Sequence, residues 1–194
     1  MAAAQQGAMI VFEGLDGVGK STQIQRLRET LESKGHEVVV QPFPDRTTPV
    51  GQVLDAYLKG LVEIHDRAVQ LLFSANRWEV ADKIQDLRRS GVVVLVDRYV
   101  YSARAYDIAK GLEPLQEDGL PKEDLVVFLD KAGVGGDDEG SEVACVAVAE
   151  RYETTEFQSR VREAFDTSEF SVVDANGTID QVAKRVWDTV VSVI

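Results

Sequence analysis

A chain of 194 residues with 44% apolar side chains can bury a sizeable core, and it predicts a single domain over residues 1–194. A net charge of −12 argues against extended nucleic-acid binding, and purely apolar runs such as 92–96 are too short for a membrane span of about 20 residues. The single cysteine, Cys145, cannot form an internal disulfide, so we expect a reducing compartment, the cytoplasm or the nucleus. Because of the net charge and the short apolar runs, we expect no nucleic-acid or membrane partner.

Short apolar runs alternate with longer segments of helical period along the chain. Because this pattern is typical of a parallel sheet covered by helices, the predicted fold class is α/β. In chain order, strands are expected at 9–13, 37–41, 92–97, 125–130 and 170–174. Helices are expected between residue 20 and Gly35, at 50–59, 65–90 and 101–110, and from 179 onward. Pro42 and Pro44 should end the second strand, because proline cannot donate to a sheet ladder.

Residues 14–21 match the phosphate-binding pattern Gly-x4-Gly-Lys-Ser/Thr and lie between a predicted strand and a predicted helix. The glycines let backbone N–H groups close around a phosphate, and the following helix points its positive dipole end at the ligand. Lys20 would contact the β and γ oxygens, and Ser21 would offer a hydroxyl to Mg²⁺. A chance glycine turn is the alternative, and the flanking elements argue against it. The predicted ATP-binding residues are Gly14, Gly17, Val18, Gly19, Lys20, Ser21 and Thr22.

The apolar run 92–96 is followed by Asp97, so a buried strand should deliver a carboxylate at its C-terminal end. Open α/β sheets bind their ligands at that edge. Taken alone, a strand that ends in aspartate is most often a turn signal. With the glycine loop upstream, we predict that Asp97 and Ser21 hold Mg²⁺.

Four arginines stand out by position: Arg46, Arg77, Arg98 and Arg151. Each alone would most often be a solvated surface residue. Arg46 follows the second strand and Arg98 follows Asp97, so both should lie near the ligand edge, where guanidinium groups can clamp an acceptor phosphate. Phe73 and Arg77 lie four residues apart on one helix face, which suits a nucleobase. A core phenylalanine beside a surface arginine fits that spacing equally well.

Beyond these patterns, the sequence resembles thymidylate kinase, with closest similarity to the eukaryotic and poxviral branch. The motifs that carry the resemblance span nearly the whole chain and are Phe12-Glu13-Gly14, Phe43-Pro44-Asp45-Arg46, residues 71–79, Asp97-Arg98-Tyr99, residues 119–122 and residues 150–153. The stretches 73–79 and 97–99 are specific to that family, whereas the glycine loop alone is not.

The resemblance implies a P-loop NTPase three-layer fold with a five-stranded parallel sheet flanked by helices, a lid at about 131–152 and a homodimer. It implies in-line phosphoryl transfer from ATP, with Mg²⁺, onto dTMP to give dTDP. In that reading Phe73 stacks on thymine, Arg77 hydrogen-bonds its edge, and Arg46 and Arg98 hold the monophosphate. The remaining residues implied to bind dTMP are Asp16 at the sugar 3′-hydroxyl, Phe43, Tyr106, Tyr152 and Gln158.

Two features depart from the pattern of the eukaryotic branch: the glycine loop resembles that of bacterial members, and the lid region is acidic. Gly17 stands where eukaryotic members usually carry an arginine, and the lid region is acidic, as it contains Asp137, Asp138, Glu139 and Glu142. Some cation should still stabilise the transferring phosphoryl group. Our hypothesis is that Arg151, at the end of the lid, is this catalytic arginine, alongside Lys20, Asp97 and Arg98. Arg104 is the rival, although a solvated helix position explains it too.

Other functions also use a phosphate-binding glycine loop. The chain could be a kinase for another nucleoside monophosphate or for a deoxynucleoside. Only Phe73, Arg77 and the tyrosines favour dTMP as the substrate over these alternatives. A catalytically idle nucleotide sensor would fit the missing loop arginine. A regulatory GTPase would need an Asn-Lys-x-Asp element, and neither Asn76 nor Asn176 has that context.

Overall fold

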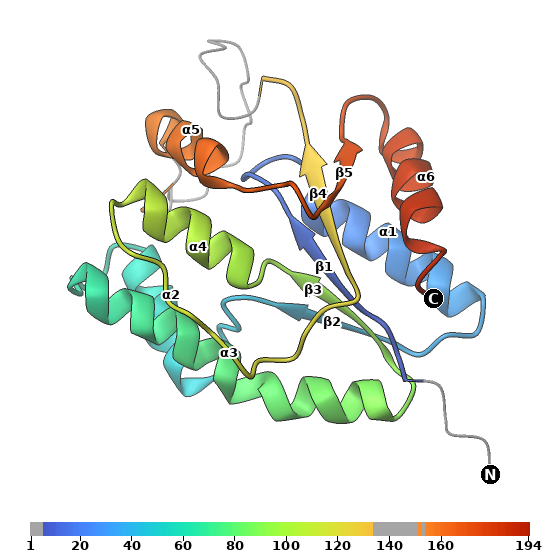
Figure 1. Ribbon diagram of the computed structural model, residues 1–194, viewed down its shortest axis with the longest axis horizontal. Helices are drawn as coiled ribbons and strands as arrows, with labels where there is room; N and C mark the ends of the chain where they lie inside the picture. The colour runs from blue at the N-terminus through green and yellow to red at the C-terminus, as the bar shows by residue number, and fades with distance from the viewer. Residues whose placement is uncertain (1–5, 134–150, 153) are drawn as a thin grey trace.

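The computed structural model describes residues 6–133, 151–152 and 154–194. Within them, five parallel strands form one sheet of order β2-β3-β1-β4-β5 (Figure 1). The strands are β1 (Met9–Glu13), β2 (Val38–Pro42), β3 (Val93–Asp97), β4 (Leu125–Asp130) and β5 (Ser171–Asp174). The helices are α1 (Lys20–Ser33), α2 (Pro49–Leu58), α3 (Asp66–Arg89), α4 (Val100–Ala109), α5 (Thr155–Ala164) and α6 (Ile179–Val190). The predicted α/β class, with a five-stranded parallel sheet flanked by helices, is confirmed.

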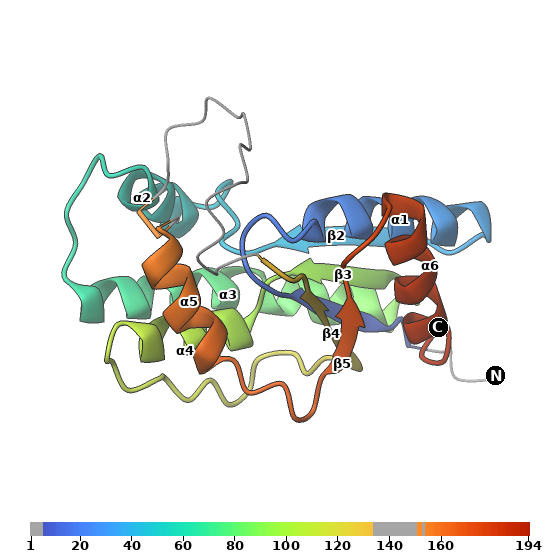
Figure 2. The same ribbon diagram turned by 90° about the horizontal axis from the view of Figure 1, so that it is seen from above.

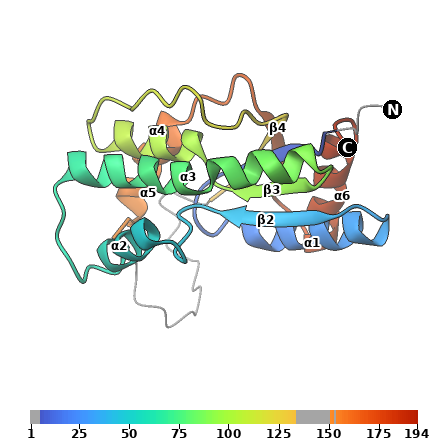
Figure 3. The ribbon, with the colours of Figure 1, turned by 90° about the horizontal axis from the view of Figure 1, so that it is seen from below.

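Helices cover both faces of the sheet, so its central strands are apolar along most of their length. Every residue of β1 is buried. Because successive side chains of a strand point to opposite faces, Met9 and Val11 pack with Ile84 of α3, while Ile10 and Phe12 join the core under α1 and α6. Figure 3 shows α3 on one side of β2 and β3 and α1 on the other.

The carboxyl ends of the parallel strands meet at one edge of the sheet, and the site is built there. The segments after β1, β2 and β3 carry the glycine loop, Arg46 and Arg98. Because β1 lies between β3 and β4, its last residues are close to the end of β3, where Phe12 is in register with Asp97. Figures 1 and 2 show α2, α4 and α5 gathered beyond this edge, away from α6.

Most predicted elements are observed, with ends shifted by no more than one residue. The prediction that Pro42 ends the second strand is wrong. Pro42 is the last residue of β2, in register with Asp97, instead of the residue that stops the strand. Since β2 is an edge strand, one side of its backbone needs no ladder donor and can accommodate a proline. Gly35, the expected left-handed end of the first helix, has φ 90°.

Helix α5 is not predicted by the sequence pattern. It buries few apolar side chains, Val161 fully and Phe157 in part, so it lacks a continuous apolar stripe. The lid prediction at 131–152 falls mostly on residues outside the described part of the chain, as do Cys145 and the acidic residues of that segment. Among the described helices, none combines the length and apolarity that crossing a bilayer requires.

Candidate active site

The glycine loop connects β1 directly to α1, and two of its glycines are required by geometry. Gly14 has φ 138°, and a Cβ there would lie 2.6 Å from the carbonyl oxygen of Leu129. Gly19, with φ 96°, is the N-cap of α1. Both conformations are left-handed, which side chains disfavour. The loop therefore presents backbone N–H groups and the helix N-terminus to the same space, as a phosphate site needs.

Lys20 is held inside this loop. Its side chain is buried, and its Nζ donates to the carbonyl oxygens of Gly14 at 3.0 Å and Leu15 at 2.6 Å. Burial, with a smaller contribution from the charge of Arg98, lowers the pKa of Lys20 to about 7. In this structure the ammonium group thus donates to backbone carbonyls of the loop. With a nucleotide in the loop, the same group could donate to phosphate oxygens instead.

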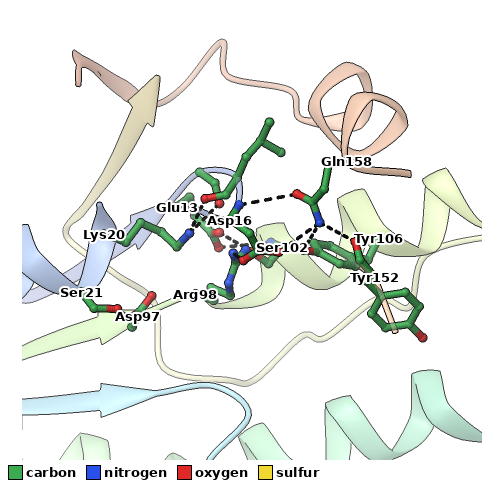
Figure 4. A network of polar contacts seen from close by, with 12 residues as sticks. Glu13, Asp16, Lys20, Ser21, Asp97, Arg98, Ser102, Tyr106, Tyr152 and Gln158 are labelled. Carbon is green, nitrogen blue, oxygen red and sulfur yellow. Dashed lines mark hydrogen bonds and ion pairs between the residues drawn. The ribbon is translucent and has the colours of Figure 1, made fainter. Parts of the chain in front are cut away.

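Ser21 and Asp97 meet beside the loop, as predicted. The Ser21 hydroxyl donates to Asp97 Oδ2 at 3.0 Å, and Figure 4 shows the two side chains side by side. Hard oxygen donors suit Mg²⁺, which typically takes one or two protein ligands and completes its shell with phosphates and water. The pair fits such an ion, and the described residues contain no cluster of three or more His, Cys, Asp or Glu side chains that could hold a metal by themselves.

A cavity of about 200 Å³ opens next to the loop. Its walls come from the glycine loop, from the segment after β2, and from α2, α3 and α4. Eight of the nine residues that the sequence assigned to dTMP line it: Asp16, Phe43, Arg46, Phe73, Arg77, Arg98, Tyr106 and Tyr152.

The ninth residue, Gln158 of α5, reaches the same site through Asp16. Its Nε2 donates to Asp16 Oδ2 at 3.0 Å and to the Tyr106 hydroxyl at 3.2 Å, and Arg98 donates to the other oxygen of Asp16 (Figure 4). Burial alone would raise the pKa of Asp16, but the charges of Arg98 and Lys20 bring that pKa below its ordinary value. Asp16 is therefore an anionic acceptor at neutral pH.

Arg98 is positioned by a residue that the sequence did not assign to the site. Its backbone has φ 66°, a left-handed conformation that is unfavourable for arginine. Next to it, the fully buried Glu13 accepts hydrogen bonds from the backbone N–H groups of Tyr99 at 2.9 Å and Ser102 at 3.1 Å, and from the Ser102 hydroxyl at 2.5 Å. Burial raises the pKa of Glu13. A charged residue that ends an apolar strand was the available signal.

The segment after β2 is fixed against α3 by Asn76, also unassigned from sequence. The completely buried Asn76 accepts from the backbone N–H of Asp45 at 2.7 Å and donates to Thr48 Oγ1 at 2.8 Å. Arg46, which follows Asp45 in the chain, lines the cavity and forms an ion pair with Asp55 of α2 at 2.6 Å. The two arginines assigned to the acceptor phosphate, Arg46 and Arg98, thus border one cavity.

Phe73 and Arg77 also reach the cavity from α3. Arg77 is buried and forms an ion pair at 2.6 Å with Glu117, from the connection between α4 and β4. Farther along the wall, Lys110 donates to the Tyr152 hydroxyl, which lies 2.7 Å from the hydroxyl of Tyr57. Gln70, Asp107 and Lys110 line the cavity without having been predicted.

Arg151 lies apart from these groups. Its guanidinium binds Glu63 at 2.6 Å and lies over the ring of Tyr57, and its backbone N–H donates to Leu58 at the end of α2. It is absent from the lining of the cavity. The rival, Arg104, is exposed on α4. In this conformation neither arginine contacts the glycine loop within the described residues.

The parallel sheet, the glycine loop with its lysine and the arginine-lined cavity define a P-loop kinase. The family model described as thymidylate kinase matches residues 12–186 of the chain. The chain belongs to the thymidylate kinase family, as the resemblance in its motifs implied.

Curated relatives and a solved structure agree with this assignment. The chain is 40% identical to a thymidylate kinase of Homo sapiens, covering 93% of this chain and 88% of that protein. It is 38% identical to a thymidylate kinase of Dictyostelium discoideum, covering 94% and 84%. The solved thymidylate kinase of Candida albicans superimposes with a TM-score of 0.76 at 34% identity, over 96% of this chain and 92% of that one.

Proposed function

We propose that the chain transfers the γ-phosphoryl group of ATP to dTMP in the cavity beside the glycine loop. The observation that carries this proposal is that one cavity brings together Phe73 and Arg77, suited to a base, and Arg46 and Arg98, suited to a phosphate. The Asp16 carboxylate links that cavity to the loop in which the ATP phosphates would bind.

The transfer needs charge stabilisation more than a base. The acceptor phosphate is already an anion at neutral pH, so no strong general base is required. Arg46 and Arg98 would hold this anion by charge-assisted hydrogen bonds, and Lys20 would leave the carbonyls of its own loop to contact the β and γ oxygens. Ser21 and Asp97 would hold Mg²⁺, which neutralises charge on the donor phosphates when it is bound.

Around the nucleoside, Phe73 would stack on thymine and Arg77 would donate to its edge. Phe43 forms part of the same wall and packs against Tyr99, with ring centroids 5.6 Å apart. Asp16, kept anionic, would accept a hydrogen bond from the sugar 3′-hydroxyl. Two tyrosines and the amide that supports Asp16 would occupy the space beside the deoxyribose: Tyr106, Tyr152 and Gln158.

The catalytic role of Arg151 stays a proposal. To act, its guanidinium must exchange the carboxylate of Glu63 for the transferring phosphoryl group. The pair with Glu63 is exposed on the glutamate side, where the side chain is 81% accessible, and such ion pairs contribute little stability. The exchange is therefore energetically accessible.

The single domain, its lid at 131–152 and the cytoplasm as compartment also stay proposals.

The homodimer implied by the resemblance is likewise proposed. Leu71 and Trp78, seven residues apart on α3, are 59% and 47% exposed, a spacing that places both on one helix face. A second copy of the chain would cover them. Sedimentation velocity checks the assembly, and a monomer at micromolar concentration would contradict it.

The proposed reaction is tested by a coupled assay of ADP release with Mg-ATP and a panel of nucleoside monophosphates and deoxynucleosides. The expected result is turnover that is fastest with dTMP. Equal rates with dTMP and UMP would overturn the thymidylate assignment, and turnover of unphosphorylated deoxynucleosides would indicate another kinase. Nucleotide binding without any turnover would identify a sensor.

A further inference from the structure

Arg77 is held by one carboxylate in a two-point contact. Its Nε donates to Glu117 Oε1 at 3.2 Å and its Nη2 donates to Glu117 Oε2 at 2.6 Å. Both side chains are buried, with exposed fractions of 4% for Arg77 and 7% for Glu117. Two parallel hydrogen bonds between planar groups fix the plane of the guanidinium as well as its position.

The segment that carries Glu117 is anchored on both α3 and α4. Gly119 has φ 102°, and a Cβ there would lie 3.2 Å from the Trp78 ring of α3, so this backbone sits closely on the helix. Two residues later, the carbonyl oxygen of Pro121 accepts a hydrogen bond at 3.1 Å from the hydroxyl of the buried Tyr99, the N-cap of α4. Glu117 is thus presented from a fixed backbone.

This contact decides which part of Arg77 is left for a ligand. In a planar guanidinium, Nη1 lies opposite the edge formed by Nε and Nη2, so it points away from Glu117. Arg77 lines the cavity, and a guanidinium carries donors and no acceptor. The group can therefore bind a carbonyl oxygen on a base, as at position 4 of thymine or uracil, and it has nothing to accept the amino group of cytosine at that position.

We propose that Glu117 is a positioning residue of the base site: it fixes Arg77 so that one donor nitrogen selects pyrimidines that carry a carbonyl at position 4. The inference rests on the proposed placement of the base beside Phe73 and Arg77. Without Glu117, the long arginine side chain regains rotamers and its buried charge loses its partner, so the donor nitrogen is no longer fixed toward the base.

The test compares Glu117→Gln with Asp118→Asn. The control makes the same change of carboxylate to amide at an exposed neighbour. For Glu117→Gln we expect KM for dTMP to rise about tenfold, an effect of about 1.4 kcal/mol. KM for ATP should stay within twofold, and the ratio of kcat/KM for dTMP over dCMP should fall about tenfold. Asp118→Asn should leave all three quantities unchanged.

A second background separates positioning from a general structural effect. In an Arg77→Met enzyme, Glu117→Gln should add no further increase in KM for dTMP, because the group that Glu117 positions is gone. An equal increase in both backgrounds, or parallel rises in KM for dTMP and ATP, overturns the proposal. If Glu117→Gln does not fold, Glu117→Asp is measured instead, with the same expectations at a smaller amplitude.

Failure of this inference is distinguishable from failure of the proposed function. Wild-type enzyme that does not phosphorylate dTMP refutes the function itself. Wild-type enzyme that phosphorylates dTMP, with an unchanged dTMP over dCMP ratio in the folded Glu117 variants, refutes the role of Glu117 alone.

Discussion

At the scale of single residues, the charge state of Lys20 depends on what the glycine loop contains. Burial lowers its pKa to about 7, and the nearby Arg98 acts in the same direction. An anionic phosphate in the loop would oppose both effects, because pairing with an anion favours the charged ammonium group. The charge of Lys20 should therefore be coupled to nucleotide binding.

Binding of Mg-ADP at pH 8 should accordingly take up a proton. About nine tenths of Lys20 is neutral one pH unit above its pKa, and the bound phosphates would restore its charge. Calorimetric titrations in two buffers of different ionisation enthalpy measure the uptake, which should approach one proton. Lys20→Arg, which keeps the charge permanently, should abolish it. Wild-type binding without proton uptake would contradict the prediction.

The catalytic arginine can be identified by a matched pair of substitutions. Arg151→Ala should lower kcat at least tenfold, because a guanidinium on the transferring group is worth about 10³ to 10⁵ in related reactions. Arg104→Ala should change kcat less than twofold, since Arg104 is exposed on α4 and acts electrostatically on Asp166. Steady-state rates at saturating dTMP and ATP decide it. A loss confined to Arg104→Ala would reverse the assignment.

Residues with a local signal could be predicted from the sequence, whereas residues with distant partners could not. The glycine loop and Asp97 follow directly from a strand and its terminus. Glu13, Asn76 and Glu117 act through partners 28 to 89 positions away in the chain, as the contacts of Asn76 with Thr48 and of Glu13 with Ser102 illustrate. No spacing rule reports such pairs, because burial and tertiary contact define them.

At the scale of elements, the sequence predicts those with a continuous apolar pattern. The five strands and the long α3 each have one, and their ends agree with the structure within one residue. Helix α5 is missed because one of its two buried residues is Gln158, a polar side chain that turns inward to bind Asp16. Propensity and pattern cannot anticipate a polar residue whose buried partners come from other elements.

The packing of α2 against the segment after β2 offers a sharp test of element geometry. A Cβ at Gly51 would lie 1.7 Å from the carbonyl oxygen of Asp45, so Gly51→Ala must displace that backbone and with it Arg46. We expect a loss of about 2–3 kcal/mol in the free energy of unfolding and a higher KM for dTMP. Urea denaturation and steady-state kinetics measure both effects.

Gly60→Ala is the control for that substitution. Gly60 has φ 70°, but a Cβ added there would meet nothing within 4 Å, so alanine introduces backbone strain without a clash. It should cost about 1 kcal/mol and leave KM for dTMP unchanged. Equal effects on stability and KM for the two variants would show that the close approach at Gly51 does not organise the phosphate site.

At the scale of the whole molecule, strand order assembles the site. Because β1 pairs with β3, the loop after one strand and Arg98 after the other become neighbours. The α/β pattern predicts that ligands bind at this edge, but it does not give the order of the strands within the sheet. The strand order and the set of residues that line the cavity could be obtained only from the fold itself.

The net charge of the molecule should make its stability rise with salt. The chain carries 33 acidic and 21 basic side chains, so its compact state concentrates negative charge. Salt also weakens ion pairs, but those at the surface, such as Arg26–Asp180, Arg89–Asp86 and Lys184–Asp188, are largely exposed and contribute little. Screening of the net repulsion should therefore dominate.

Raising NaCl from about 0.01 M to 0.1 M shortens the screening length from about 30 Å to about 10 Å. We expect Tm to rise by about 2–4 °C, which corresponds to about 1 kcal/mol for a chain of this size. Calorimetry without nucleotide or Mg²⁺ measures it, and choline chloride should act like NaCl because screening does not depend on the cation. A falling Tm would mean that ion pairs outweigh the net charge, and a rise with NaCl alone would indicate a specific cation site.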